Sequence, residues 1–327
     1  MLPSRRHVLH LAVGGVLASA RLASAQSYPE RPIRLVVPFP PGGAYDGLGR
    51  PWADRIKPLL GTVVVENIGG AGASMGAAAV ARAKPDGYTL LLGGTLPHVN
   101  ETLLKNKPLY DPVKDLDPIM RIAVGHLAIA VHPSVPVNTL SELVAYIKAN
   151  PGKVSYGHSG VGGTNHLIGE LFKSVAGIPD LIQIPYRGAG PAMTDLVSGQ
   201  IPMGIVGVQA QSLGFHRSGA IRILAFTSEK PLAAAPEVPT AVSAGFPDIA
   251  NASSYGLLAP AGTPRPIIEK VAQASRTLLS TAAYQQLMVD MGFEATPESD
   301  PEDFRRVLAA DVALWAPVVK SLGLKLD

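Results

Sequence analysis

The sequence predicts an α/β fold with two lobes, each built on a mostly parallel sheet that helices cover on both faces. Two observations predict it. Apolar runs of strand length alternate with segments of helix length almost to the end of the chain. In addition, a chain of 327 residues without any cysteine is longer than one hydrophobic core usually organises, and it must be stabilised by its own cores.

The expected strands are apolar and bounded by turn residues, at 33–39, 62–68, 88–94, 119–124, 127–132, 153–157, 181–185, 202–207, 221–227 and 254–259. The expected helices between them are 45–59, 73–83, 139–149, 164–176, 191–198, 264–282 and 301–321. Two helix starts are explicit. Thr139 with Glu142 resembles a capping box, and Asp300 precedes a first turn that carries Glu302 and Asp303.

No long linker or low-complexity stretch separates two domains, so we expect the lobes to be joined by crossing strands. The first crossing is placed near 121–126 and the return near 222–228. This predicts that residues 26–124 and 226–327 form lobe I and that residues 125–225 form lobe II.

Residues 1–25 have the character of a cleaved export signal. Arg5-Arg6 is a twin-arginine stretch, a short apolar core follows, and Ala23-Ser24-Ala25 is a small-x-small cleavage site. The core is about ten residues long, too short for the roughly 20 that a membrane-spanning helix needs. We therefore expect export to the periplasm by the twin-arginine route, with cleavage after Ala25.

Composition excludes several classes of function. The formal charge of +3 comes from the three arginines of residues 1–25, so the remainder is neutral and shows no nucleic-acid footprint. The absence of cysteine removes disulfides, thiolate catalysis, zinc–thiolate sites and a lipidated anchor. No later segment of the sequence is apolar for long enough to cross a bilayer.

Three glycine loops each follow a predicted strand and lead into a predicted helix, at residues 40–46, 158–164 and 186–192. A helix N-terminus has free backbone N–H groups and the positive end of the helix dipole, so it can hold an anion. In open α/β sheets such loops converge beyond the carboxyl ends of the strands. The alternative is that glycine simply makes tight turns between strand and helix. This alternative explains a single such loop better than it explains three.

Two enzymatic interpretations fail on spacing. Ser159 lies in a Gly-His-Ser sequence, but a hydrolase nucleophile elbow needs glycine two residues after the serine, and that position is Val161. Residues 70–76 are glycine-rich after a strand, but the spacing is one residue too long for the usual dinucleotide fingerprint. The next strand, 88–94, also lacks the acid that would bind a ribose.

The histidines do not form a metal set, because His98, His158 and His166 are irregularly spaced and only Glu170 lies at helical spacing from one of them. We therefore expect no metal, no cofactor and no catalytic residues.

Three charged residues beside the glycine loops are open to two interpretations. Asp46 and Asp195 lie early in their helices and either stabilise the loop or contact a ligand. Arg187 is either a direct partner of an anion or a side chain that points to solvent.

Several motifs, in the correct order over essentially the whole chain after residue 25, resemble the Bug family of extracytoplasmic solute receptors, the substrate-binding components of tripartite tricarboxylate transporters. The matching motifs are Pro38-Phe39-Pro40-Pro41-Gly42-Gly43 with Asp46 and Arg50, Lys84-Pro85-Asp86-Gly87-Tyr88-Thr89-Leu90, Gly163-Thr164-x-His166-Leu167-x-Gly169-Glu170, Tyr186-Arg187-Gly188-x-Gly190-Pro191-Ala192-x-x-Asp195-Leu196 and Pro260-Ala261-Gly262-Thr263-Pro264.

The resemblance implies a type II periplasmic-binding-protein fold that closes on a small mono- or dicarboxylate, aromatic acids included, and hands it to membrane permease subunits. It implies binding without chemistry, by a monomer. The ligand-binding positions that it implies are Phe39, Gly42, Gly43, Asp46, Thr95, His98, Ser159, Gly163, Thr164, His166, Tyr186 and Asp195.

Two alternative functions remain open at this point. One is an exported α/β enzyme such as an esterase or isomerase, and the other is the same receptor used as a signalling sensor. The residues do not identify the carboxylate.

Overall fold

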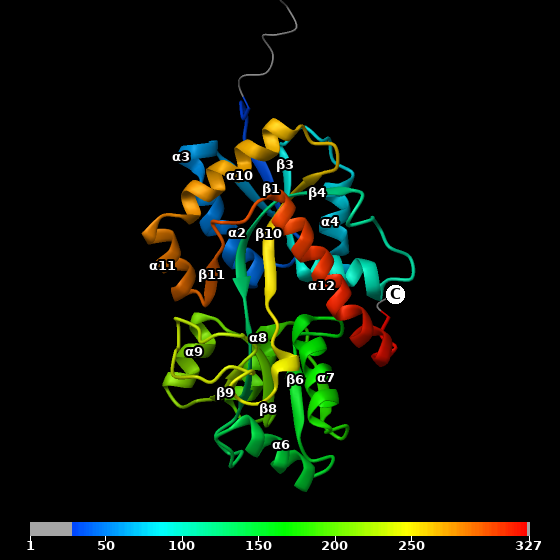
Figure 1. Cartoon of the computed structure of the whole chain (residues 1–327), viewed down its shortest axis with the longest axis vertical. Coiled ribbons are helices and arrows are strands. Elements are labelled where there is room, and N and C mark those ends of the chain that lie inside the picture. The colour runs from blue at the N-terminus through cyan, green and yellow to red at the C-terminus, as the bar shows by residue number, and fades with distance from the viewer. Residues whose placement is uncertain (1–27, 326–327) are drawn as a thin grey trace, which may run out of the picture.

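The computed structural model describes residues 28–325; the expected export signal and its cleavage site lie outside these residues. Two lobes lie one above the other, and Figure 1 shows strands β4 and β10 of the upper lobe reaching toward the lower one. We call the part built on the six-stranded sheet lobe I and the part built on the five-stranded sheet lobe II. No helix between residues 28 and 325 is both long and apolar enough to cross a bilayer.

Lobe I contains the sheet β11-β4-β10-β3-β1-β2. Its strands are β1 (Ile33–Val37), β2 (Val63–Asn67), β3 (Thr89–Gly94), β4 (Leu116–Gly125), β10 (Ser253–Pro260) and β11 (Phe293–Ala295). Its helices are α2 (Ala44–Arg55), α3 (Lys57–Leu60), η1 (Ala71–Ala73), α4 (Ser74–Ala81), α5 (Thr95–Val99), η2 (Asn100–Leu104), α10 (Arg265–Leu279), α11 (Ala282–Asp290) and α12 (Pro301–Leu322).

Lobe II contains the sheet β7-β6-β8-β5-β9. Its strands are β5 (Leu127–Val131), β6 (Ser155–His158), β7 (Ile182–Pro185), β8 (Met203–Gly207) and β9 (Arg222–Phe226). Its helices are α6 (Leu140–Ala149), α7 (Thr164–Ala176), α8 (Ala189–Val197), α9 (Ala210–Arg217) and η3 (Pro247–Ile249).

Both sheets are mixed, although most strands of each point the same way. In lobe I, β10 is antiparallel to β3 and β4, and the short β11 is antiparallel to β4. In lobe II, β5 is antiparallel to β8 and β9. The crossings explain why β5 and β10 are antiparallel to their neighbours. The chain enters each lobe from the side that faces the other lobe, which is also where the parallel strands end. The entering strand therefore runs in the opposite direction.

The two crossings are hydrogen-bonded to each other. β4 ends at Gly125, within the expected crossing at 121–126, and β5 begins at Leu127, one residue beyond it. Thr227 links the two connections: its Oγ1 accepts from the Leu127 amide at 3.0 Å and donates to the Asn251 carbonyl at 2.9 Å. These contacts place the pivot between the lobes at 125–127 and near 251.

The return crossing lies later than the expected 222–228. Residues after β9 stay on lobe II: Ala241 and Ile249 are buried in its core, and the Phe246 ring meets Phe172 edge-on at 5.8 Å. The chain rejoins the lobe I sheet only at Ser253. The segment between β9 and β10 contains no strand, so the hydrophobic pattern of the sequence does not indicate that it stays on lobe II.

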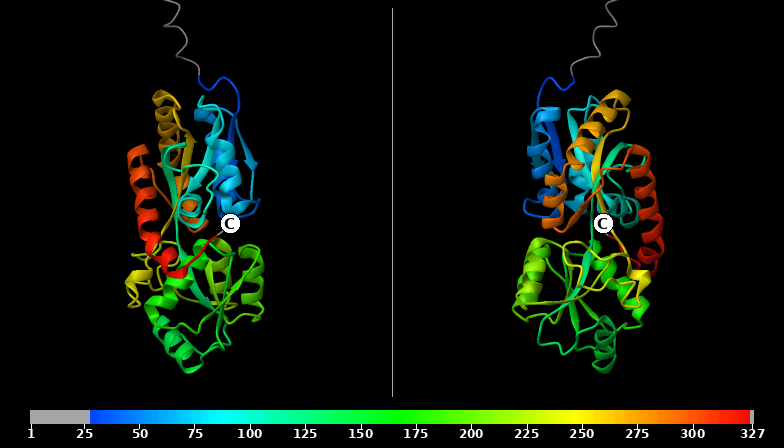
Figure 2. Two further views of the ribbon diagram at one scale, coloured as in Figure 1. Left: turned by 90° about the vertical axis from the view of Figure 1, so that its right-hand side faces the viewer. Right: turned by 60° about the vertical axis from the view of Figure 1, so that its left-hand side comes forward.

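Helix α12 packs against both lobes, whereas the expected division gave all of 226–327 to lobe I. Its first half buries Phe304 and Leu308 in lobe I, and its second half buries Trp315 and Val319 among lobe II side chains. The views in Figure 2 show the helix running down the side of the molecule from the upper lobe onto the lower one. The last helix is therefore a third structural link between the lobes.

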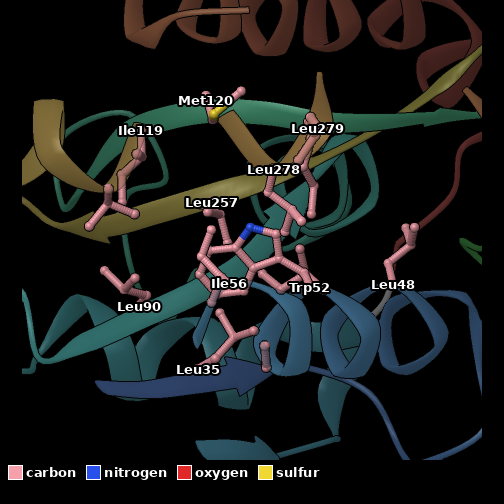
Figure 3. Close-up of a cluster of buried hydrophobic side chains, with 14 of the residues drawn as sticks. Leu35, Leu48, Trp52, Ile56, Leu90, Ile119, Met120, Leu257, Leu278 and Leu279 are labelled. Atoms are coloured by element: carbon pink, nitrogen blue, oxygen red, sulfur yellow. The ribbon is translucent and has the colours of Figure 1, made fainter. Parts of the chain in front are cut away.

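The core of lobe I is centred on Trp52, which helix α2 places against the sheet. Figure 3 shows its indole surrounded by side chains that include Leu35, Leu257 and Leu278. Its Nε1 donates to the Ser275 hydroxyl of α10 at 3.3 Å, so the buried N–H has a partner. This packing fixes α2, and with it the glycine loop at its start.

The ten expected strands and seven expected helical segments all have counterparts within residues 28–325, with 45–59 divided into α2 and α3. The elements that we did not expect are short: η1, β11, α5 with η2, α9, α11 and η3. Their hydrophobic patterns extend over too few residues to stand out from loops.

Candidate functional site

A cavity of about 620 Å³ lies between the lobes, within the size range of small-molecule sites. The segments that follow β1, β6, β7 and β8 line it, so the carboxyl ends of strands from both sheets face one space. Arg187 is the only acidic or basic side chain other than histidine that lines it within the described residues. The arrangement favours an anionic ligand, since no carboxylate is present among the described residues that line the cavity.

Helix α7 presents an open N-terminus to the cavity. Its cap residue is Gly163, which provides no side-chain hydrogen bond, and its first turn carries no acid. Gly163, Thr164 and Asn165 all line the cavity. The first N–H groups of an α-helix have no partner within the helix, so these donors are available to a ligand.

Helix α8 repeats the arrangement. Its cap Gly188 has φ +112°, a conformation that glycine adopts readily, and neither a side-chain cap nor a first-turn acid is present. Ala189 and Gly190 line the cavity. The exposed Arg187 precedes them and makes no ion pair or side-chain hydrogen bond with another described residue. A free guanidinium thus stands beside a second set of free amides.

Side chains behind these loops hold them in place. The Ser159 hydroxyl donates to Asn165 Oδ1 at 2.9 Å, and Asn165 Nδ2 donates to the Ile205 carbonyl at 2.8 Å. The amide of Gly162 donates to His166 Nδ1 at 3.2 Å, and the His166 ring stacks on His158 at 4.6 Å. Burial, together with the neighbouring His158, lowers the pKa of His166 to about 4, so the ring is neutral at pH 7.

Helix α2 of lobe I differs because it already carries a carboxylate. Its cap Gly43 supplies no side chain, but Asp46 in the first turn accepts from the Gly42 amide at 3.0 Å, from Arg50 and from Asn67. Burial opposes the ionisation of Asp46, but these hydrogen bonds outweigh it and lower its pKa below the usual value. Asp46 therefore braces the loop and partly neutralises the helix start.

Four aromatic rings form a continuous wall along the lobe I side of the cavity. Phe39 lies 4.6 Å from Tyr45, Tyr45 meets Tyr255 edge-on at 4.8 Å, and Tyr255 meets Phe293 edge-on at 5.5 Å, between ring centroids. All four line the cavity and pack at the border of the Trp52 core. We call these four side chains the ring wall.

Four other predicted site residues are paired or buried behind the cavity. Tyr186 donates to Asp195 Oδ2 at 2.7 Å, and burial together with this bond raises the pKa of Tyr186 to about 12. Thr95 is 1% exposed; its hydroxyl donates to Asp311 and accepts from the Ser254 amide. His98 is buried as well, and burial lowers its pKa to about 4.

The structure thus divides the twelve predicted site residues into two groups. Those that line the cavity are Phe39, Gly42, Gly43, Ser159, Gly163 and Thr164. Those that lie behind it are Asp46, Thr95, His98, His166, Tyr186 and Asp195. Direct ligand contact stays a prediction for all twelve, and the second group does not line the cavity in this structure.

Sequence reasoning missed most of the ring wall. Tyr45 lies within the first glycine motif and could have been included on that ground. Tyr255 and Phe293 come from β10 and β11, more than two hundred residues after Phe39, and reach the cavity only through the return crossing. No local pattern marks them.

The groups around Ser159 do not form a hydrolase arrangement. Its hydroxyl donates to an asparagine oxygen rather than to a histidine, so it has no base to activate it. In the part of the chain that the structure covers, no three His, Asp or Glu side chains are grouped as a metal would require.

Comparison with known proteins identifies the same architecture. Residues 50–324 match the family described as tripartite tricarboxylate transporter family receptor. Protein BugT of Bordetella pertussis is 36% identical over 324 residues, covering 97% of this chain and 98% of BugT.

Two solved structures agree over almost their full lengths. The periplasmic binding protein BugD is 34% identical with a TM-score of 0.80, covering 91% of this chain and 99% of that one. Rpa4515 of R. palustris, solved with adipate, is 31% identical with a TM-score of 0.83, covering 91% and 99%. The two-lobed periplasmic-binding-protein fold is confirmed, and the chain belongs to the tripartite tricarboxylate transporter receptor family, as its Bug-like motifs predict.

Proposed function

We propose that this receptor captures a small carboxylate between its lobes and releases it chemically unchanged to the permease of a tripartite tricarboxylate transporter. The relative solved with adipate supports a carboxylate as the ligand class. The match to a receptor family and the unactivated Ser159 support binding rather than catalysis.

The observation that carries the proposal is the pair of open helix starts in lobe II. Helices α7 and α8 each begin on glycine, without a side-chain cap or a first-turn acid. Both line one cavity beside Arg187, which has no ionic partner among the described residues. A carboxylate is an acceptor for two or more hydrogen bonds, and charge-assisted bonds to N–H groups are the stronger kind. Such a ligand would satisfy donors that are otherwise left to water.

Closure follows from the division of the contacts between lobes. A ligand held by lobe II gains the contacts of Phe39, Gly42 and Gly43 only when lobe I approaches, with the pivot near 125–127 and 251. The ligand then binds the closed state better than the open state, which is the condition for it to drive closure. The permease would recognise the closed form.

The site needs no cofactor or metal in this proposal, and the protein acts as a monomer. Export through the signal at 1–25, with cleavage after Ala25, would place it in the periplasm, where the family's BugD is described as a periplasmic binding protein.

A thermal-shift screen over mono- and dicarboxylates tests the proposal, because a ligand that binds only the native state raises the melting temperature. Calorimetry on each hit should give one site per chain, and chromatography should recover the acid unchanged. Turnover of the acid would contradict the receptor function, and a screen in which no carboxylate shifts the melting temperature would contradict carboxylate binding.

A further inference from the structure

We propose that the ligand is a carboxylate with one anionic end and a ring-sized apolar body, which lies with its charge on lobe II and its body on the ring wall of lobe I. This inference rests on the proposed function and specifies the class and orientation of its ligand.

The charges along the cavity are distributed asymmetrically. Lobe II contributes Arg187 and the helix starts of α7 and α8, none of which has an anionic partner among the described residues. Lobe I contributes the start of α2, where the N–H of the preceding Gly42 already donates a hydrogen bond to Asp46. Since Asp46 stays ionised and partly offsets the dipole of α2, an incoming carboxylate finds the stronger positive field on lobe II.

The ring wall has the opposite character. Its four members are aromatic, and the histidine beside them is uncharged at pH 7, because burial lowers the pKa of His126 despite the nearby Glu294. Aromatic rings present a negative face and exclude water, so a carboxylate pressed against these faces would lose hydrogen bonds to water and could regain only those that the Tyr45 and Tyr255 hydroxyls donate. A second carboxylate on the ligand would therefore be unfavourable there.

The ring wall is available for contact. Phe39 and Tyr255 are only partly buried in the protein, and both line the cavity. Across the cavity, lobe II offers aliphatic side chains from β8 and α8, including Val206 and Met193. Rings on one side and aliphatic groups on the other suit an apolar body, and enclosing a phenyl-sized group is worth about 10- to 100-fold in affinity.

Three probes separate the elements of this inference in calorimetry on the purified protein. The first is 3-phenylpropanoate, with one carboxylate and a ring; the second is succinate, with two carboxylates and no ring; the third is 3-phenylpropanamide, with a ring and no charge. We expect 3-phenylpropanoate to bind at least about tenfold more tightly than succinate, and the amide to bind more weakly than either acid.

Variants of Tyr255 test whether the ring wall holds the body. Tyr255→Ala should weaken 3-phenylpropanoate about tenfold while changing succinate by less than about twofold, and Tyr255→Phe should keep the affinity because it keeps the ring. Tyr146→Ala removes a partly buried tyrosine of α6 that does not line the cavity, and should change neither acid. Melting temperatures verify that each variant is folded.

Two results would overturn the inference and leave the proposed function in place. One is tighter binding of succinate than of 3-phenylpropanoate, and the other is an equal loss for both acids in Tyr255→Ala, with Tyr255→Phe failing to restore either. If the full carboxylate screen gives no melting shift at all, the proposed function itself fails.

Discussion

Helices α6 and α12 begin on side chains that cap them, whereas α7 and α8 begin on glycine. In α6, Thr139 accepts from the Glu142 amide at 3.1 Å, and in α12, Asp300 accepts from the Asp303 amide at 2.7 Å. Both helices also carry acids in their first turns, and neither lines the cavity. In α7 and α8 the corresponding donors have no side-chain cap and face the cavity.

The difference indicates how this chain divides stability from binding. A side-chain cap satisfies an N–H group permanently and contributes about 1 kcal/mol to folding. An uncapped start gives up that contribution and leaves the donors free for a ligand. We infer that the starts of α7 and α8 are kept open for a carboxylate, whereas those of α6 and α12 are closed for stability.

The largest expected effect comes from giving a cavity helix its own acid. Gly190 is the second residue of α8, and a Cβ added there meets no atom within 4 Å, so the substitution introduces no clash. We expect Gly190→Asp to lower the affinity for a carboxylate ligand by at least about 100-fold. The new carboxylate would occupy the start of α8 itself and repel the carboxylate of the ligand. Calorimetry with a carboxylate that passes the screen measures the loss.

The matched control is Gly190→Asn, which has nearly the same shape without the charge. It should weaken binding only a few-fold. Both variants should melt within a few degrees of the wild type, since a Cβ at this position meets no atom within 4 Å. Equal affinities of the Asp and Asn variants would show that the start of α8 is not the anion site.

The next effect concerns Arg187, the one lysine or arginine among the described residues that line the cavity. Arg187→Gln should weaken the carboxylate about tenfold, the value expected for loss of one charge-assisted hydrogen bond. Its affinity should also depend less on salt than that of the wild type, because an exposed charge is screened. Arg265→Gln changes an exposed arginine of α10 outside the cavity and serves as the control. An unchanged affinity in Arg187→Gln would mean that the guanidinium points to solvent.

A substitution at the start of α12, which does not line the cavity, should change stability and not binding. Asp300→Ala removes the cap of α12 and should lower the free energy of unfolding by about 1 kcal/mol, with ligand affinity unchanged. The counterpart at a cavity helix is Thr164→Ala, which should leave stability within about 0.5 kcal/mol and weaken the ligand a few-fold. Urea unfolding measures the stability of both variants, and calorimetry measures their ligand affinity. A fall in affinity in Asp300→Ala would contradict the division between stabilising and binding helix starts.

The smallest effect is a pH dependence that belongs to α2, the intermediate case. Hydrogen bonds lower the pKa of Asp46 below its ordinary 3.8, so the unfolded chain binds a proton more readily than the folded one. The stability from Asp46 is therefore present above the ordinary pKa and is lost as the pH falls through the folded value. Urea unfolding between pH 6 and 3 should show a shallower loss for Asp46→Asn, and identical slopes would contradict the assignment.

Local signals in the sequence were sufficient for much of the fold. Thr139 with Glu142 and Asp300 before Pro301 both marked true helix starts, because a cap depends on residues only three apart. The glycine loops likewise lead into helices capped by Gly43, Gly163 and Gly188, although α8 begins at Ala189, two residues before the expected 191. Each of these features is determined within one turn of the chain.

The remaining parts of the fold and site depend on contacts between distant segments. Tyr255 and Phe293 join Phe39 only after β10 returns from lobe II, and the length of that return, through Ile249, is set by packing on α7 rather than by any local pattern. The motifs also could not separate residues that line the cavity from those that do not, since Gly42 and Asp46 lie in one motif but only Gly42 lines the space.

A crystal structure with a carboxylate from the thermal-shift screen tests the central claim most directly. We expect a carboxylate oxygen within about 2.7–3.2 Å of backbone nitrogens at the start of α7 or α8, with the Arg187 guanidinium on the same group and the body of the ligand against Tyr255. A carboxylate bound instead at Gly42 and Gly43, with both lobe II helix starts left to water, would contradict the account.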